Sequence, residues 1–135
     1  MELVFVVDDH GGIEFNSRRQ SRDRGLIRDL AEVAGSKPIC CLPYSEMLFE
    51  KAGVPVKVSP VFPGDSRPDS VWFLEKTDLS SFSDAEKVIL YCWNRSYPFD
   101  KILSFDFSEY ELESEFEFTG SSHKGITRKI YRKRK

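Results

Sequence analysis

Short hydrophobic segments separated by polar loops run along the whole chain and predict an α/β domain. The first segment, ELVFVV at residues 2–7, is continuous rather than alternating, as in a strand that is buried on both faces. Further strands are expected at residues 37–42, 54–60, 70–76 and 87–93. The last of these, KVILYCW, also lacks alternation and should be equally buried.

Two helices are predicted between the first three strands. From about residue 23 to Gly35, apolar side chains recur at helical spacing, and a glycine is well suited to end such a helix. Residues 43–53 begin with Pro43 and end on Gly53, which predicts a second, shorter helix. Residues 62–68 are rich in turn formers, and residues 78–86 predict a short helical or turn segment.

The C-terminal part of the chain predicts an antiparallel hairpin, with strands at residues 110–118 and 126–133 around TGSSHKG at 119–125. Acidic residues alternate along the first strand and basic residues lie on the second, so opposite charges should face each other. These residues are Glu111, Glu113, Glu115 and Glu117, and Arg128, Lys129, Arg132 and Lys133. We therefore interpret the basic C-terminus as part of a sheet rather than as a nucleic-acid-binding tail.

The order of elements predicts one domain over residues 1–135, with a mixed, mostly parallel sheet flanked by short helices and closed by the antiparallel hairpin. Lys and Arg number 20 against 22 Asp and Glu, so non-specific nucleic-acid binding is not expected. The three cysteines have no metal-type spacing and favour free thiols in a reducing compartment. Without a signal peptide or an apolar run of roughly 20 residues, a cytoplasmic protein with no membrane partner is expected.

The polar segment after the first strand is the main candidate for chemistry. It begins with two aspartates and a histidine and carries several arginines, but neither GxGxxG nor a P-loop is present, so no standard nucleotide fingerprint exists. HxxxH and HExxH are absent, and no metal ligand set is assigned. In GSSHKG, Ser122 precedes His123, but the nucleophile motif GxSxG is missing, and we interpret this stretch as a hairpin turn.

This chain resembles dihydrofolate reductase in its order of elements and in several short motifs. ELVFVVDDHGGIEFN is similar to the first strand and active-site loop of that family, with Gly12, Ile13 and Asn16 matching and Glu14 in place of the second glycine. DLAEVAGSKPICCLPYSEMLFE resembles the first helix, the next strand and the following helix start. SDAEKVILYCW, SFDFSEYELESEFEF and GITRKIYRKRK resemble the late strand and the closing hairpin. The resemblance implies a dihydrofolate reductase-like fold over most of the chain.

Departures from the family pattern imply that its chemistry is not retained. The cofactor-phosphate motif G-R-x-T would fall on CLPYS, which lacks both the glycine and the arginine, and FLEKTDL replaces the glycine pair after the fourth strand. The family's loop tryptophan is absent near Gln20. Its catalytic carboxylate would fall near Leu26, which Asp23 and Asp29 flank without matching. Hydride transfer with a nicotinamide cofactor is therefore not expected.

The resemblance also implies that residues 8–24, 93–99 and 119–125 converge on one side of the sheet. Arginine forks match phosphate or carboxylate groups, and aromatic rings stack on bases. We therefore expect a non-reductase domain that binds an anionic small molecule, with a nucleotide as one candidate. The expected ligand-binding residues are Asp8, Asp9, His10, Asn16, Arg18, Arg19, Arg22, Trp93, Arg95, Tyr97, Ser122 and His123.

Several alternatives stay open at this point. The arginines could be solvated and neutralised in weak surface pairs by Asp8, Asp9, Glu14 and Asp23. The chain could be an enzyme, either a reductase with altered cofactor contacts or a metal-assisted hydrolase that uses Asp8, His10 and His123. It could also be a protein-interaction module that presents aromatic residues to a partner. The sequence assigns no cofactor and does not decide between binding and catalysis.

Overall fold

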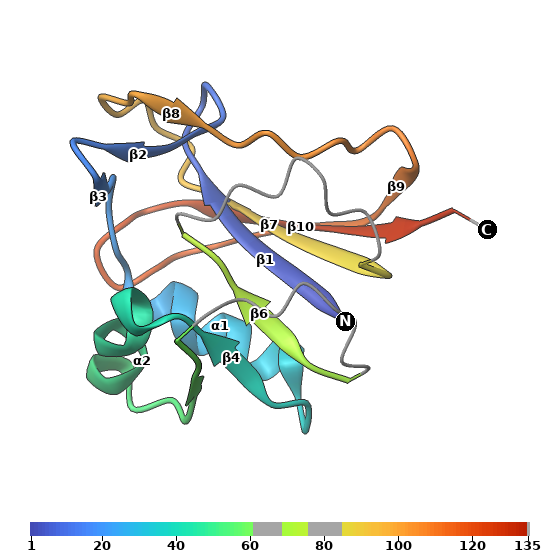
Figure 1. The fold of residues 1–135 in the computed structure, drawn as a ribbon. Coiled ribbons are helices and arrows are strands. Elements are labelled where there is room, and N and C mark those ends of the chain that lie inside the picture. Colours follow the sequence, from blue (N-terminus) through green and yellow to red (C-terminus); the bar gives the residue numbers. More distant parts are fainter. Residues whose placement is uncertain (61–68, 76–84, 135) are drawn as a thin grey trace.

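A seven-stranded sheet with the order β5-β4-β6-β1-β7-β10-β9 forms the centre of the molecule (Figure 1). The structure is a computed structural model that describes residues 1–60, 69–75 and 85–134. The strands are β1 Glu2–Val7, β4 Ile39–Cys41, β5 Lys57–Val58, β6 Val71–Phe73, β7 Lys87–Cys92, β9 Tyr110–Phe118 and β10 Ile126–Lys133. Neighbouring strands from β5 to β7 are parallel, and β10 is antiparallel to both β7 and β9. The predicted mixed, mostly parallel sheet with a terminal hairpin is confirmed.

Helix α1 Arg24–Ala34 and helix α2 Glu46–Ala52 occupy the two predicted helical segments, and a short 3-10 helix, η1 Pro43–Ser45, precedes α2. Both helices end on a glycine with positive φ, Gly35 at 62° and Gly53 at 71°. Among the described helices none is long and apolar enough to span a membrane. The turn predicted at residues 62–68 and most of the segment predicted at residues 78–86 lie outside the described residues.

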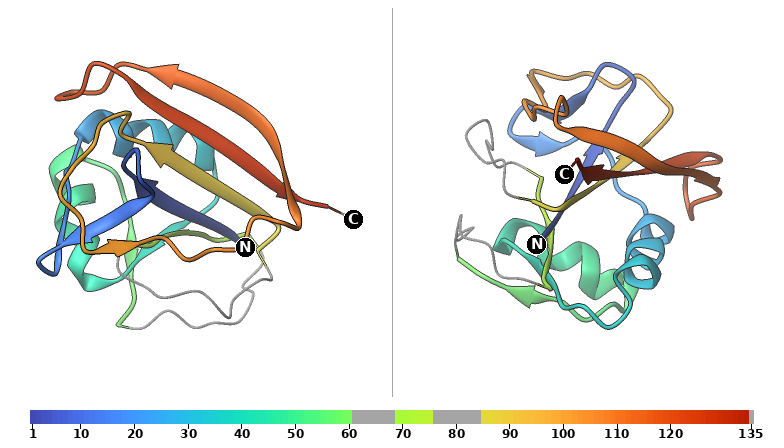
Figure 2. Two further views of the ribbon diagram at one scale, coloured as in Figure 1. Left: turned by 90° about the horizontal axis from the view of Figure 1, so that it is seen from above. Right: turned by 90° about the vertical axis from the view of Figure 1, so that its right-hand side faces the viewer.

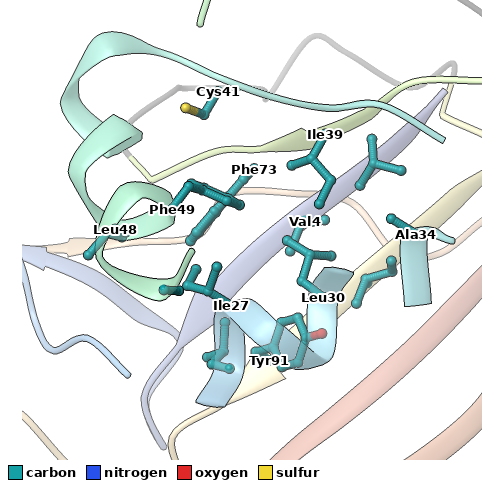
Figure 3. Packing of buried hydrophobic residues seen from close by; sticks show 14 of the residues in the cluster. Val4, Ile27, Leu30, Ala34, Ile39, Cys41, Leu48, Phe49, Phe73 and Tyr91 are labelled. Carbon is teal, nitrogen blue, oxygen red and sulfur yellow. The ribbon is translucent and has the colours of Figure 1, made fainter. Parts of the chain in front are cut away.

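The sheet buries side chains on both faces, which explains the continuous hydrophobic run of β1. Both helices lie on one side of the sheet (Figure 2). On that side Val4 packs among residues of α1 and α2, and Figure 3 shows Ile27 and Leu30 of α1 pointing toward it. Leu3 and Phe5 belong to a second cluster on the opposite face. The aromatic side chains that cover this second cluster include Phe105, Phe107 and Tyr110.

A small second sheet, with the order β3-β2-β8, is formed by residues outside the strands that the hydrophobic pattern predicts, and β2 and β3 lie in the segment predicted as a polar loop. Its strands are β2 Gly12–Phe15, β3 Arg18–Arg19 and β8 Lys101–Ile102. Strands of two to four residues are too short to show a periodic pattern, and the prediction of a polar connection there is wrong. The sheet buries Glu14, whose carboxylate lies 3.3 Å from the Lys101 ammonium.

Charges face each other across β9 and β10, as the sequence predicts. Lys129 Nζ lies 3.8 Å from Glu115 Oε1, and Arg132 pairs with Glu113. Arg128 differs, because its guanidinium reaches Asp29 of α1 at 2.7 Å rather than a glutamate of β9. Most basic side chains of the C-terminal segment, up to and including Arg134, are therefore paired with acidic side chains within the fold.

Candidate functional site

Three loops meet at one edge of the sheet because of how the strands are paired. β1 and β7 are parallel and in register, with Val7 opposite Cys92, so the chain leaves both strands side by side. β10 is antiparallel to β7, with Thr127 opposite Cys92, which brings the turn at residues 119–125 to the same edge. Hydrogen bonds join the loops, including Asp9 N–H to Arg95 O at 2.9 Å. The structure thus brings together the loops that the resemblance placed at one site.

Asp8 holds the first two loops in place and is buried itself. Its carboxylate accepts hydrogen bonds from the backbone N–H groups of His10, Gly12 and Tyr97 at 2.9, 2.7 and 3.1 Å, and from Gln20 Nε2 at 3.1 Å. Burial on its own would raise the pKa of Asp8, but these hydrogen bonds outweigh it and hold the pKa below its ordinary value. Asp8 therefore fixes the loop at residues 8–24 against the loop at residues 93–99 through buried hydrogen bonds.

His123 is the centre of a second buried cluster. Its Nδ1 lies 2.9 Å from Asp23 Oδ2, and its Nε2 lies 3.0 Å from both Ser21 Oγ and Tyr97 OH. The indole of Trp93 stacks on the imidazole, with the ring centroids 4.4 Å apart. Each of the three loops contributes to this cluster, and only 7% of the surface of His123 is exposed. Sequence reasoning selected His123, Tyr97 and Trp93 but missed Ser21 and Asp23.

The carboxylate of Asp23 accepts hydrogen bonds from several donors. Besides His123, it accepts hydrogen bonds from the N–H groups of Ser121 and Ser122, both at 2.8 Å, and from Leu26 N–H at the start of α1 at 3.1 Å. Burial would raise the pKa of Asp23, and the donors overcome it and hold the pKa far below its ordinary range. A side chain at Gly120 would collide with the carboxylate, so the glycine allows this close approach. Asp23 therefore stays ionised.

Arg19 is committed to an ion pair inside the protein. Its Nε and Nη2 donate to the two carboxylate oxygens of Glu75 at 2.7 and 3.0 Å, a bidentate arrangement. Its guanidinium also lies over the Tyr44 ring, 4.3 Å from the centroid. Burial would lower the pKa of Arg19, and the contact with Glu75 raises it instead. Arg19 is therefore not available as a free ligand for an anion.

Other predicted residues lie at the rim of the converged loops. Arg18, Arg22 and Arg95 are exposed, and no carboxylate in the described part of the chain forms an ion pair with them. Asn16 occupies the turn between β2 and β3, and Asp9 is exposed. Three of the four acids that could have neutralised the arginines have other partners, since Asp8 accepts backbone donors, Glu14 pairs with Lys101 and Asp23 binds His123. Three cationic side chains thus remain open to solvent.

His10 belongs to a different cluster from His123. Its ring stacks on Phe99 with centroids 5.5 Å apart, and its Nε2 lies 3.2 Å from Ser96 Oγ. Within the described residues, no three His, Cys, Asp or Glu side chains are grouped so that they could hold a metal ion. The structure therefore does not bring Asp8, His10 and His123 together as a ligand set.

A groove lined by basic side chains lies beside the His123 cluster, between α1, α2 and the turn at residues 119–125. Its volume is about 330 Å³. Its walls are made by Arg22, Asp23, Arg24, Ile27, Arg28, Leu48, Lys51, Ser121 and Ser122. Sequence reasoning missed Arg28 and Lys51, because they lie on separate helices that meet only in the folded chain. The spacing of Arg24 and Arg28, four residues apart on one helix, was the only signal in the sequence.

Comparison with known proteins identifies the fold. No family model matches the sequence, and no curated protein matches it either. A dihydrofolate reductase from Enterococcus faecalis, solved in complex with NADP(H) and RAB-propyl, superposes with a TM-score of 0.64 over 99% of this chain and 96% of that one. The fold is that of dihydrofolate reductase. Identity to that enzyme is 10%, so the likeness concerns the fold alone.

The dihydrofolate reductase in this comparison was solved with NADP(H), and this chain departs from the cofactor motifs of that family in two stretches. After β6, where the family has a glycine pair, Leu74 is buried and Glu75 places a carboxylate that accepts from Ser45 Oγ at 2.6 Å and from Arg19. After β4, Pro43 begins η1 in the stretch where the family's arginine motif would fall. Side chains and a carboxylate thus occupy the two stretches in which the sequence departs from the cofactor motifs of the family.

Proposed function

We propose that this protein binds an anionic small molecule in the basic groove between α1, α2 and the turn at residues 119–125. The observation that supports this proposal is the charge of the groove. Four cationic side chains line it, Arg22, Arg24, Arg28 and Lys51, against the single carboxylate of Asp23. The charge of that carboxylate can offset only one of the four cations, so the lining of the groove keeps a net positive charge.

The shape and floor of the groove suit a small organic anion. Its volume of about 330 Å³ falls at the lower end of the range of roughly 300–1,000 Å³ that is typical of ligand pockets. Ile27 and Leu48 form apolar parts of the lining, and the hydroxyls of Ser121 and Ser122 add polar contacts. The Arg28 guanidinium is oriented by a hydrogen bond from its Nε to Ala52 O at 3.4 Å. A phosphate or carboxylate group on an apolar body matches this combination.

Thermal unfolding with a panel of ligands tests the proposal. The panel contains inorganic phosphate, mono- and dinucleotides, folates and NADPH. A ligand at about 100 times its dissociation constant adds roughly 2.7 kcal/mol of stability, which raises the Tm of a domain of this size by several degrees. We expect at least one anionic member to raise the Tm, and the shift to disappear in Arg24→Ala/Arg28→Ala.

Arg18→Ala/Arg95→Ala is the matched control, because it removes the same number of exposed arginines outside the groove. We expect this variant to keep the shift. Loss of the shift in the control but not in the groove variant would move the site to the loops at residues 8–24 and 93–99. No shift with any anion would overturn the proposal and favour a protein-interaction module.

A further inference from the structure

We propose that Ser21, His123 and Asp23 form a nucleophilic triad that hydrolyses a small carboxylic ester. This activity differs from ligand binding in the basic groove and does not depend on it, although Arg22 and Asp23 also line the groove. The three residues come from two loops that are 100 positions apart in the sequence, and the fold alone unites them.

The hydrogen bonds have the connectivity that nucleophilic catalysis by serine requires. Ser21 Oγ lies 3.0 Å from His123 Nε2, and His123 Nδ1 lies 2.9 Å from Asp23 Oδ2. Because the ionised carboxylate can only accept, it holds the proton on Nδ1 and leaves Nε2 as the acceptor for the serine hydroxyl. A hydroxyl, an imidazole and a carboxylate in this order are a nucleophile, its general base and the group that orients the base.

Contacts on several sides hold the His123 imidazole in one orientation. Trp93 covers one face of its ring, and Tyr97 OH gives Nε2 a second neighbour at 3.0 Å. Asp23 is 5% exposed and is fixed by backbone donors from Ser121 and Ser122. A base that is prepositioned in this way loses little entropy when it takes the serine proton.

Ser21, unlike its two partners, is open to a substrate. It is half-buried and lines a surface concavity of about 370 Å³ together with Arg18, Arg19, Arg22 and Tyr44. On its inner side it borders a cavity of about 20 Å³, a space for little more than one water molecule or a methyl group. Val6, Ile13 and Trp93 are among the apolar residues of that inner cavity.

These two spaces indicate the class of substrate. The inner cavity has a size that matches the methyl group of an acetyl ester. Arg18 and Arg22, whose charges are not paired within the described residues, face the outer concavity and favour a negative charge on the alcohol part. The substrate we infer is therefore an acetyl ester of an anionic alcohol or phenol.

The reaction balances with water as its only co-reactant. Ser21 Oγ forms a bond to the acyl carbon while its proton moves to His123 Nε2. The bond from the acyl carbon to the alcohol oxygen then breaks, and the same proton passes from Nε2 to that oxygen, which releases the alcohol. A water molecule attacks the acyl-serine with His123 as base again, releases the carboxylic acid and restores the Ser21 hydroxyl.

The fold contains an internal comparison for this cluster. Ser96 Oγ lies 3.2 Å from His10 Nε2, so a second serine–histidine pair exists on the same side of the sheet. Among the described residues, no carboxylate forms a hydrogen bond with the other ring nitrogen of His10, and both Ser96 and His10 are exposed. Ser122 Oγ also lies 3.2 Å from His123, at Nδ1. If contact with a histidine were enough to activate a serine, all three serines would react; the triad predicts that only Ser21 does.

Mapping of a covalent label on the folded wild-type protein is the first test. A fluorophosphonate reacts with activated serines, and peptide mass spectrometry identifies the modified residue. We expect the label on Ser21 and not on Ser96. No label on Ser21, or equal labelling of both serines, would overturn the proposal. This test needs no variant, so it remains decisive even if changes at His123 or Asp23 prevent folding.

Hydrolysis of para-acetoxybenzoate and of its methyl ester, in which the carboxylate is blocked, tests the reaction and the substrate class. We expect Ser21→Ala to lower kcat/KM for the anionic ester by ~10²-fold or more, and Ser96→Ala to leave it unchanged. Arg22→Ala should remove the preference for the anionic ester. Hydrolysis that survives in Ser21→Ala would refute the triad, and equal rates for the two esters in the wild type would refute the anionic substrate. Neither result bears on the Tm shifts that test the groove.

Discussion

Asp23 is the residue that connects most of the site. It begins α1 by accepting the Leu26 N–H, and it anchors the turn at residues 119–125 through Ser121, Ser122 and His123. A carboxylate buried among this many donors is stabilised in its ionised form, and an amide in its place would leave donors without a charged partner. The stability of the protein should therefore depend on this single charge.

Asp23→Asn should lower the free energy of unfolding by about 3 kcal/mol at pH 7, the cost of losing charged hydrogen bonds in a buried cluster. The folded-state pKa of Asp23 lies below its unfolded value, so its contribution is complete above the unfolded pKa and is lost as the pH falls toward the folded one. The difference between wild type and variant should therefore shrink below about pH 4. Urea unfolding at pH 7 and at pH 3 measures both quantities.

Asp9→Asn is the control, because Asp9 is exposed in the same loop. A surface change of this kind usually alters stability by no more than about 0.5 kcal/mol. A difference between wild type and Asp23→Asn that stays constant with pH would show that the effect of the substitution does not depend on the charge of Asp23, and it would contradict the prediction.

At the scale of elements, the β2–β3 hairpin is the feature that was least visible in the sequence. Its turn has positive φ at both central residues, 52° at Asn16 and 61° at Ser17, the signature of a type I′ turn. Asparagine tolerates this conformation, whereas serine does so only at a cost. The hairpin positions Arg18 and Arg19, so its stability matters for the concavity in front of Ser21.

Ser17→Gly should raise the free energy of unfolding by about 0.5–1 kcal/mol, because glycine adopts positive φ without a steric penalty and Asn-Gly is the preferred pair in this turn. Ser17→Ala is the control, since it removes the hydroxyl but keeps the Cβ that causes the strain. Chemical denaturation of both variants measures the effect. Equal stability of the two variants would mean that the backbone at this position is not strained.

The difference between elements that were predicted and those that were missed has a physical cause. β1 and β7 are six residues each and are buried on both faces, so their hydrophobic runs are unmistakable. The helices carry an apolar stripe and glycine ends, which are local signals. β2, β3 and β8 have four, two and two residues, and their pairing depends on the loops that the large sheet brings together. The local pattern of hydrophobic and polar residues cannot indicate such pairing.

For the site, the sequence indicated which loops meet but not which side chains meet. The resemblance in order of elements was enough to bring together residues 8–24, 93–99 and 119–125, and the fold comparison confirms the dihydrofolate reductase-like architecture. Asp23 could be explained from sequence as a helix cap, which hid its second role toward His123. Arg19 looked like a free cation because Glu75, 56 residues away, gives no local signal of their pairing. Contacts of this range are properties of the whole molecule.

At the scale of the whole molecule, we predict that the dihydrofolate reductase-like fold does not carry reductase activity. The prediction rests on Leu74 and the Glu75–Arg19 pair, which lie in the stretch that resembles the family's glycine-pair segment, and on Pro43 in the stretch that resembles its phosphate motif. We expect that adding dihydrofolate to the protein and NADPH causes no decrease in NADPH absorbance. As a positive control, an active dihydrofolate reductase added to the same mixture should cause that decrease. NADPH raising the Tm without turnover would agree with this expectation, since the basic groove can hold its phosphates. Turnover by the wild type that disappears in Asp23→Asn would contradict it, because the carboxylate beside α1 would then serve a reductase after all.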